Sequence, residues 1–207
     1  MKVVSLCRIL PILTLAVVGV IVSGCASHKH TSHINFQPNV FQPLVSSPKA
    51  SLRVAEFQDY RHVTDKAVLV SQRNGHGYTT SGVVAGQEPL AGIFRDGLIQ
   101  VLEENNFELA PTSGMYELRG GIRDLTFNVV TDFWGATGRP KLQVHFELVN
   151  RFSGNSVWKK TYTGGHALST PWSADATMVK LFNESANDVL QQLLADNSFR
   201  RYFETRD

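Results

Sequence analysis

Cysteine is scarce in this sequence: the 207 residues include only Cys7 and Cys25. Cys7 lies in the N-terminal segment, residues 1–24, that we expect to be removed, so the remaining chain can form no internal disulfide. No nucleophile elbow, H-E-x-x-H motif, P-loop or dinucleotide-binding fingerprint occurs either. The sequence gives no residue set from which a reaction can be argued, and we expect a protein that is not an enzyme.

An excess of positive charge is also missing. The sequence has 20 Lys and Arg residues, 18 Asp and Glu residues and a formal net charge of +2. Two of the basic residues, Lys2 and Arg8, precede residue 25, so residues 25–207 balance 18 basic against 18 acidic side chains. A neutral chain lacks the basic footprint of a nucleic-acid-binding protein, and no nucleic-acid partner is expected.

One long apolar run, Ile9 to Val22, follows the two basic residues. It is about as long as the apolar segment of a signal peptide and shorter than the roughly 20 residues of a membrane-spanning helix. The run leads into Val22-Ser23-Gly24-Cys25, which resembles the lipobox of bacterial lipoproteins. In that family a diacylglyceryl group is attached to the cysteine thiol, the peptide is cut before this residue, and the new amino group is usually acylated.

The resemblance implies that residues 1–24 are a signal peptide and that Cys25 carries a diacylglycerol and an N-acyl chain, with no other cofactor. Each buried methylene contributes about 0.8 kcal/mol, so more than one acyl chain makes the anchorage effectively permanent. Ala26 stands where Asp marks retention in the inner membrane in enteric-type sorting. We therefore expect a lipid anchor in the outer membrane, on its periplasmic face, with the inner membrane as the alternative.

Residues 25–50 lack a helical period and are rich in proline and small polar residues. The near-repeat of Phe36-Gln37-Pro38 and Phe41-Gln42-Pro43 favours an extended, polyproline-like tether. Apolar side chains in the tether either dock on the folded domain or contact lipid. These side chains are Phe36, Phe41, Leu44 and Val45.

Three histidines beside the predicted anchor, His28, His30 and His33, form an H-x-H-x-x-H cluster. Imidazole groups at this density can bind Zn, Cu or Ni, but a specific site needs a fixed geometry and usually a fourth ligand. No cysteine is available as that ligand. We therefore favour a His-rich polar spacer and predict no metal site.

Residues 51–207 suffice for one hydrophobic core and are expected to form a single domain with two amphipathic helices. The first helix begins near Pro89, which suits a first helical turn, and ends at Asn105-Asn106. The second begins after Ser173, a favourable N-cap. Its predicted buried stripe, at helical spacing, consists of Val179, Phe182, Ala186, Val189, Leu190 and Leu193.

Apolar and polar residues alternate in four other segments, as in half-buried strands. These segments are Leu52–Phe57, Tyr116–Val129, Leu142–Leu148 and Val157–Thr163. A phase slip at Arg123-Asp124 predicts a β-bulge, and Asn74-Gly75 predicts a hairpin turn in an exposed segment between residues 67 and 86. The order β-α-β-β-β-α predicts an α+β two-layer sandwich, with both helices on one face of a mainly antiparallel four-stranded sheet.

This element order behind a lipobox resembles the YajG-type family of small Gram-negative lipoproteins. The similar features are Asp59-Tyr60-Arg61 after the first strand, Asn106-Phe107 after the first helix, and Phe199 and Phe203 after the last. The order is also similar to that of lipopolysaccharide-assembly lipoproteins and of auxiliary lipoproteins of ABC transporters. The YajG family has no established activity, so the resemblance implies a fold and a location rather than a reaction.

The densest polar group of the domain comprises Asp59, Arg61, His62, Asp65 and His76. A histidine near a carboxylate is capable of acid–base work, but the sequence supplies no nucleophile or substrate pocket beside it. We therefore interpret the group as a strand-end ion pair with solvated loop residues. By the same argument His145 is interpreted as an exposed sheet residue rather than a ligand.

Large aromatic side chains in predicted loops are the better candidates for partner binding. They are Phe133 and Trp134, in a loop that we expect to include Gly138 and Pro140, and Trp172 before the last helix. The alternative is that these rings cap the open end of the core, and it is the stronger of the two.

The leading hypothesis is a membrane-anchored, periplasm-facing lipoprotein whose non-enzymatic domain binds an envelope protein during envelope assembly. The alternative is a lipid or glycolipid carrier, or an auxiliary subunit of an envelope lipid-transport system, which needs an apolar cavity between sheet and helices. A third class, an envelope hydrolase, predicts a cleft with convergent polar groups.

Overall fold

The structure is a computed structural model that describes residues 29–31, 34, 36–39, 50–63, 65–66, 68–73, 79–85, 88–132, 135–165, 168–170 and 174–204. The main sheet has six strands. Its four main strands lie in the order β2 (Leu52–Val54), β6 (Tyr116–Asp132), β7 (Gly135–Asn150) and β8 (Ser156–Gly164). Two short strands extend it: β3 (Gln58–Asp59) pairs with β6, and β9 (Leu168–Thr170) pairs with β7.

The sheet is mixed, with β2 and β3 parallel to β6 and the other pairs antiparallel. The predicted first strand, Leu52–Phe57, is a strand only over β2, and β3 begins just beyond its predicted end. The predicted bulge is confirmed, because the register between β6 and β7 shifts between Ile122 and Asp124. Arg123 is the extra residue that this shift leaves out of the ladder.

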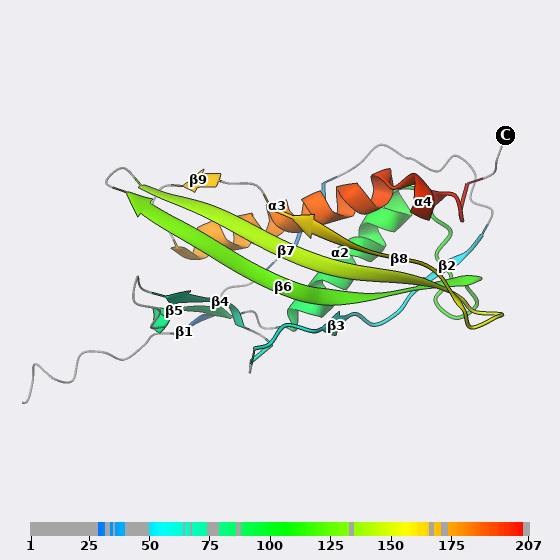
Figure 1. Ribbon diagram of the computed structural model, residues 1–207, viewed down its shortest axis with the longest axis horizontal. Coiled ribbons are helices and arrows are strands. Elements are labelled where there is room, and N and C mark those ends of the chain that lie inside the picture. The colour runs from blue at the N-terminus through cyan, green and yellow to red at the C-terminus, as the bar shows by residue number, and fades with distance from the viewer. Residues whose placement is uncertain are drawn as a thin grey trace, which may run out of the picture.

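Two helices follow the predicted pattern, α2 (Leu90–Glu104) and α3 (Ala174–Ala195), and a short helix that was not predicted, α4 (Asn197–Arg200), comes after them. The two long helices, green and orange in Figure 1, cover one face of the sheet and confirm the two-layer α+β sandwich. As predicted, α2 starts directly after Pro89 and stops before Asn105. No helix in the described ranges combines the length and apolarity that a bilayer crossing requires.

The buried stripe of α3 agrees with the prediction except at its start. Val179 is half-buried, because Met178 and Leu181 occupy the positions that face the sheet. The remaining predicted stripe residues are fully buried: Phe182, Ala186, Val189, Leu190 and Leu193.

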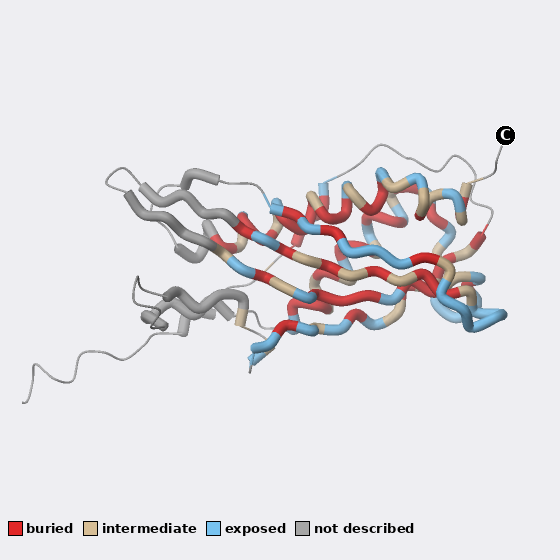
Figure 2. The backbone as a smooth tube through the Cα atoms, in the orientation of Figure 1, coloured by how far each residue is buried: buried red, intermediate tan, exposed pale blue. Residues whose placement is uncertain are grey.

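Phenylalanine rings fill the layer between sheet and helices. Phe146 of β7 lies with its ring centroid 5.8 Å from Phe57 and 6.3 Å from Phe94 of α2. A second group joins Phe107, Phe199 and Phe203 at centroid distances of 5.2 to 5.9 Å. Figure 2 shows buried positions recurring along the central strands and along the helices that pack on them.

Part of the predicted tether docks on the domain. Phe36 is 8% exposed, and its ring centroid lies 6.4 Å from Phe94 and 5.9 Å from Phe182. Gly97 provides the notch for this ring, because a Cβ atom at that position would overlap it. The backbone N–H of Asn39 donates to Asn187 Oδ1 at 2.8 Å, which fixes the segment a few residues later. Phe41, Leu44 and Val45 lie outside the described residues.

A smaller three-stranded sheet has the order β1-β5-β4. The antiparallel pair β4 (Val68–Arg73) and β5 (Thr79–Ala85) is the predicted hairpin, although its turn at Asn74-Gly75 lies outside the described residues. The strand β1 (Lys29–Thr31) adds to β5 in parallel.

The predicted loop around Gly138 and Pro140 is wrong. The strand β7 begins at Gly135, opposite Asp132, and both residues lie within it. Pro140 lies between the part of β7 that pairs with β8 and the part that pairs with β9, a position where a strand tolerates proline. The proposed binding residues Phe133, Trp134 and Trp172 lie outside the described residues.

Candidate binding groove on the open sheet face

Strand alternation divides the side chains of β6 and β7 between two environments. Leu118 and Phe146 point toward the helices and are fully buried. Arg119 and Glu147, one residue away on each strand, face the opposite side and lie directly across from one another. The face of the sheet opposite the helices, here called the open face, therefore collects polar side chains from neighbouring strands.

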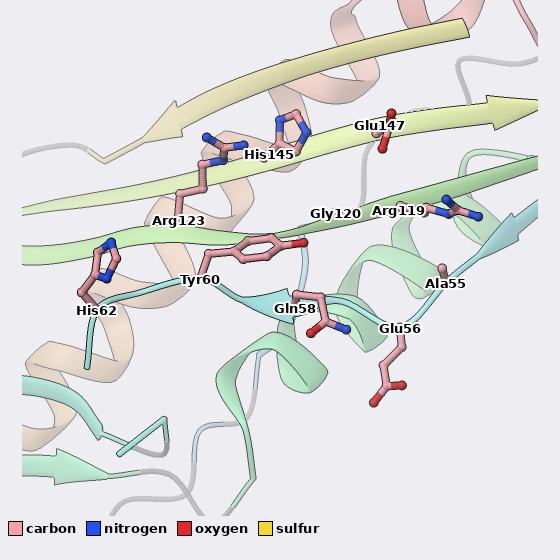
Figure 3. Close-up of a pocket in the computed structure, with 10 residues that line it drawn as sticks. All are labelled: Ala55, Glu56, Gln58, Tyr60, His62, Arg119, Gly120, Arg123, His145 and Glu147. Carbon is pink, nitrogen blue, oxygen red and sulfur yellow. The ribbon is translucent and has the colours of Figure 1, made fainter. Parts of the chain in front are cut away.

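The open face is hollowed into a shallow groove of about 930 Å³. One wall is the chain from residue 55 to 62, which runs beside β6, and the floor is formed by β6 and β7 (Figure 3). The lining consists of Ala55, Glu56, Gln58, Tyr60, His62, Arg119, Gly120, Arg123, His145 and Glu147.

Tyr60 gives the groove a fixed, exposed aromatic ring. Its side chain is 53% exposed, while its backbone N–H donates to Ile122 O at 2.8 Å and holds the residue to β6. The ring lies against Gly121, where an added Cβ atom would be 2.7 Å from Tyr60 Cε2. A glycine at this position of β6 lets the ring rest directly on the sheet.

The two arginines of the groove differ in their partners. Arg119 Nε donates to Glu117 Oε1 at 2.6 Å, and Glu117 also pairs with Arg53 at 2.9 Å. Arg123 is exposed, and no carboxylate in the described part of the chain pairs with it. The charge of Arg123 is therefore available to a ligand.

His145 lies between these groups on β7. Its Nδ1 is 3.2 Å from Thr161 Oγ1 of β8. Partial burial lowers its pKa below the ordinary value, the charges of Arg123 and Lys159 lower it further, and Glu147 acts in the opposite direction. The imidazole is therefore neutral at neutral pH and able to form hydrogen bonds in the groove. His145 lies on the outward face, as predicted, but in a half-buried site.

The polar group predicted around Asp59 is structural where the structure describes it. Arg61 Nη2 lies 2.7 Å from Asp59 Oδ2, and both side chains are almost fully buried. The same guanidinium donates to Val68 O and Lys66 O at 2.9 Å each. Burial would raise the pKa of Asp59, but the hydrogen bonds and charge of Arg61 outweigh it and hold the pKa below its usual value.

Among the described residues, no histidine of that group forms a hydrogen bond or ion pair with Asp59 or Arg61. His62 is exposed and lines the groove, and His76 lies outside the described residues. The groove gathers polar groups, as the hydrolase alternative predicted, but its lining contains no serine, threonine or cysteine to act as a nucleophile.

The structure gives no support for a metal site in its described ranges, where no three metal-ligating side chains gather. His28 and His33 lie outside these ranges, and His30 is described only as part of the backbone of β1. Cys25, the predicted lipidation site, also lies outside them.

Sequence reasoning missed three groove residues, Tyr60, Arg119 and Arg123. One signal was present: two arginines at outward positions of a predicted strand on either side of Gly121. Using it required the register that brings β7 and the segment after β2 against β6.

Comparison by sequence finds no matching family model and no matching curated protein. By structure, the chain is similar to a DUF330-family protein from Xanthomonas campestris, with a TM-score of 0.57, 16% identity and coverage of 81% of this chain and 92% of that one. A neuraminyllactose-binding hemagglutinin homolog from Helicobacter pylori gives a TM-score of 0.50, 8% identity and coverage of 83% and 96%. These two likenesses support the fold alone.

A minor lipoprotein from Acinetobacter baumannii has a TM-score of 0.42, with 18% identity and coverage of 57% of this chain and 92% of that one. A likeness at this score carries no argument about function.

Proposed function

We propose that this protein is a lipid-anchored, periplasm-facing module of the bacterial envelope that binds a protein partner through its open face and catalyses no reaction. The observation that carries the proposal is the groove, where an exposed ring and a guanidinium with no acidic partner among the described residues lie together on the sheet. Tyrosine and arginine are among the residues most enriched at binding hot spots. Tyr60 and Arg123 therefore form the centre of the proposed contact surface.

The carrier alternative receives less support. A carrier needs an apolar cavity between sheet and helices, but the described residues of that layer pack as a continuous core around Phe94, Phe146 and Phe182. The groove lies on the opposite face, and most of the residues that line it are polar or charged. A surface that binds another protein explains this distribution better than a lipid pocket does.

The contact is proposed for the face of the sheet rather than for the edge at β8. Two backbone carbonyls of β8, those of Val157 and Thr163, already accept hydrogen bonds from Tyr202 and Gln192. Lysines at positions 159 and 160 add charge to the same strand. Charged and already bonded edges disfavour the addition of a further strand.

The anchor is proposed to be the lipid on Cys25, and the docked Phe36 determines how far the domain stands from it. Ten residues, 26–35, connect the two, and three of them, Lys29–Thr31, already pair with β5 as strand β1. The domain would thus remain close to the membrane surface. The Pro-rich segment after Phe36 would not lengthen this connection.

A photo-crosslinking residue tests the proposal in cells that make the full chain. Placed at Gln58 in the groove, it should capture one envelope protein, whereas at Glu103, exposed on α2, it should not. Equal capture from both positions, or none from Gln58, would refute the open face as the contact surface. Cys25→Ser should change the mass of the chain and its partitioning into membranes, because serine has no thiol to carry the lipid, and an unchanged mass with unaltered partitioning would refute the anchor.

A further inference from the structure

The groove is not uniform in charge from one end to the other. At one end, Arg119 of β6, Glu147 of β7 and Lys159 of β8 lie in register across three strands. The carboxylate of Glu147 thus lies between two cationic residues, and Arg119 is also paired with Glu117. Positive and negative charges at this end are balanced by the protein itself.

The other end carries cationic and imidazole groups, and the described lining of the groove places no acid beside them. Figure 3 shows Arg123 next to His145, with His62 and the Tyr60 ring on the same side, while Glu56 and Glu147 lie toward the opposite end. Asp124, the nearest acidic residue along the chain, is paired with Lys141 at 3.0 Å.

The backbone explains how Arg123 reaches this position. Ile122 pairs with Val144 and Asp124 pairs with Gln143, so Arg123 is the additional residue of a β-bulge. Bulges redirect side chains and are common beside functional sites. Here the bulge leaves Arg123 exposed at the end of the groove, beyond Gly121 and the ring that covers it.

We propose that the Arg123 end of the groove binds a carboxylate on an extended segment of the partner protein, and that Tyr60 packs against the residue beside that carboxylate. This inference rests on the proposed function and names the chemistry of the partner at the same site. A guanidinium binds a carboxylate through two parallel hydrogen bonds, which gives both affinity and orientation. His145 and His62 supply further hydrogen-bonding groups at the same end.

Charge complementarity favours a peptide over an anionic membrane surface. A surface of uniform negative charge would bring anions against Glu56 and Glu147 as well as against Arg123. A peptide segment complements both ends of the groove when its acidic residue lies at Arg123 and a neutral or basic residue lies at the other end. The shallow, open form of the groove also suits an extended chain.

The test uses the purified full chain in detergent with ¹³C-labelled histidine side chains. The probes are two capped peptides, Gly-Phe-Glu-Phe-Gly and Gly-Phe-Gln-Phe-Gly. The Glu peptide should shift the His145 resonance and bind about tenfold more tightly than the Gln peptide. Arg123→Gln should abolish this difference. Arg201→Gln removes the positive charge of an exposed side chain just after α4, and it should leave the difference between the two peptides intact.

Equal binding of the two peptides, or no shift of His145 with either, overturns the inference. A His145 shift caused by phosphatidylglycerol vesicles but not by the Glu peptide also overturns it, in favour of a lipid ligand. The crosslinking experiment separates this result from the broader proposal. Capture from Gln58 together with equal peptide binding removes the carboxylate site and leaves the partner-binding function standing.

Discussion

The two faces of the main sheet have different surroundings and different roles in this protein. On the helix side, β6 and β7 present fully buried aliphatic and aromatic residues that contact the helices. On the open face, the same strands present arginine, histidine and glutamate around a groove. Because side chains alternate along a strand, each residue that stabilises the fold has a neighbour that is free to take part in recognition.

The charged groups of the two regions differ in the same way. Arg61 lies beside the sheet, nearly buried, with its guanidinium bonded to Asp59 and to two backbone carbonyls. Arg123 is exposed, with no acidic partner in the described residues. The comparison separates charges that the fold requires from charges that remain available for binding.

The largest expected effect compares two adjacent residues of β7. Phe146→Ala should lower the free energy of unfolding by about 4 kcal/mol, because it removes a fully buried ring that contacts Phe57 and Phe94. His145→Ala, on the open face, should change it by less than about 0.5 kcal/mol. Urea unfolding measures both variants, and similar losses would contradict the assignment of the two faces.

The next effect compares two arginines. Arg61→Met should cost about 3 kcal/mol, because it leaves the carboxylate of Asp59 buried without its main partner. The cost lies at the lower end of the usual range, since Lys66 Nζ remains 3.7 Å from Asp59 Oδ1.

Arg119→Met is the matched variant on the open face, where the arginine side chain is 55% exposed. The arginine is exposed, and the nearly buried Glu117 keeps its second partner, Arg53, at 2.9 Å. This variant should therefore lose no more than about 1 kcal/mol. If Arg61→Met were equally mild, the Asp59–Arg61 pair would not be structural, and a functional role for it would have to be reconsidered.

The helix side was predictable because its signals are local. The apolar period after Pro89 predicted α2, and the phase slip at Arg123-Asp124 predicted the bulge. The extent of the β6–β7 hairpin was not predictable, because Gly138 and Pro140 normally indicate a loop. Pairing along β6 overrides that local preference.

The groove was predictable only in part. Alternation places Arg119, His145 and Glu147 on outward positions, but their meeting depends on the register between distant segments. The exposed ring of Tyr60 depends on a parallel strand two residues long, which a sequence pattern does not reveal. The docking of Phe36 depends on the notch at Gly97, a contact between segments far apart in the chain.

A smaller effect tests whether the N-terminal segment belongs to the helix side. Phe36→Ala should cost about 2 kcal/mol in urea unfolding, because the ring is nearly buried against Phe94 and Phe182. Gln37→Ala, at the exposed neighbouring position, should have little effect.

Gly97→Ala makes this test sharper, because the sign of its effect on stability should depend on Phe36. In the parent chain the added methyl group overlaps the ring and should destabilise the protein. In the Phe36→Ala background the same change should stabilise it by about 0.8 kcal/mol, the usual gain of alanine over glycine in a helix. A stabilising effect in both backgrounds would show that Phe36 does not occupy the notch in solution.

The smallest expected effect is a pH dependence of the free energy of unfolding that arises from His145 on the open face. His145 is faced by Arg123 from β6, by Lys159 and Thr161 from β8, and by Glu147 on its own strand. Its pKa in the folded protein lies below the ordinary value of 6.5, so the unfolded chain binds a proton more readily. Protonation of this residue therefore favours unfolding, and its share of the stability is lost as the pH falls through and below about 6.5.

His145→Gln should reduce the loss of stability between pH 7 and pH 5 by a fraction of about 1 kcal/mol. Urea unfolding at each pH measures this loss. Phe146→Leu, on the helix side, should lower stability at every pH and leave the slope unchanged. A carboxylate bound at Arg123 would favour the protonated imidazole and reduce the slope of the parent chain. If the slope is the same in His145→Gln and the parent chain, neither burial nor the charge of Arg123 lowers the pKa of His145 in the folded protein, and the electrostatic description of the open face is wrong.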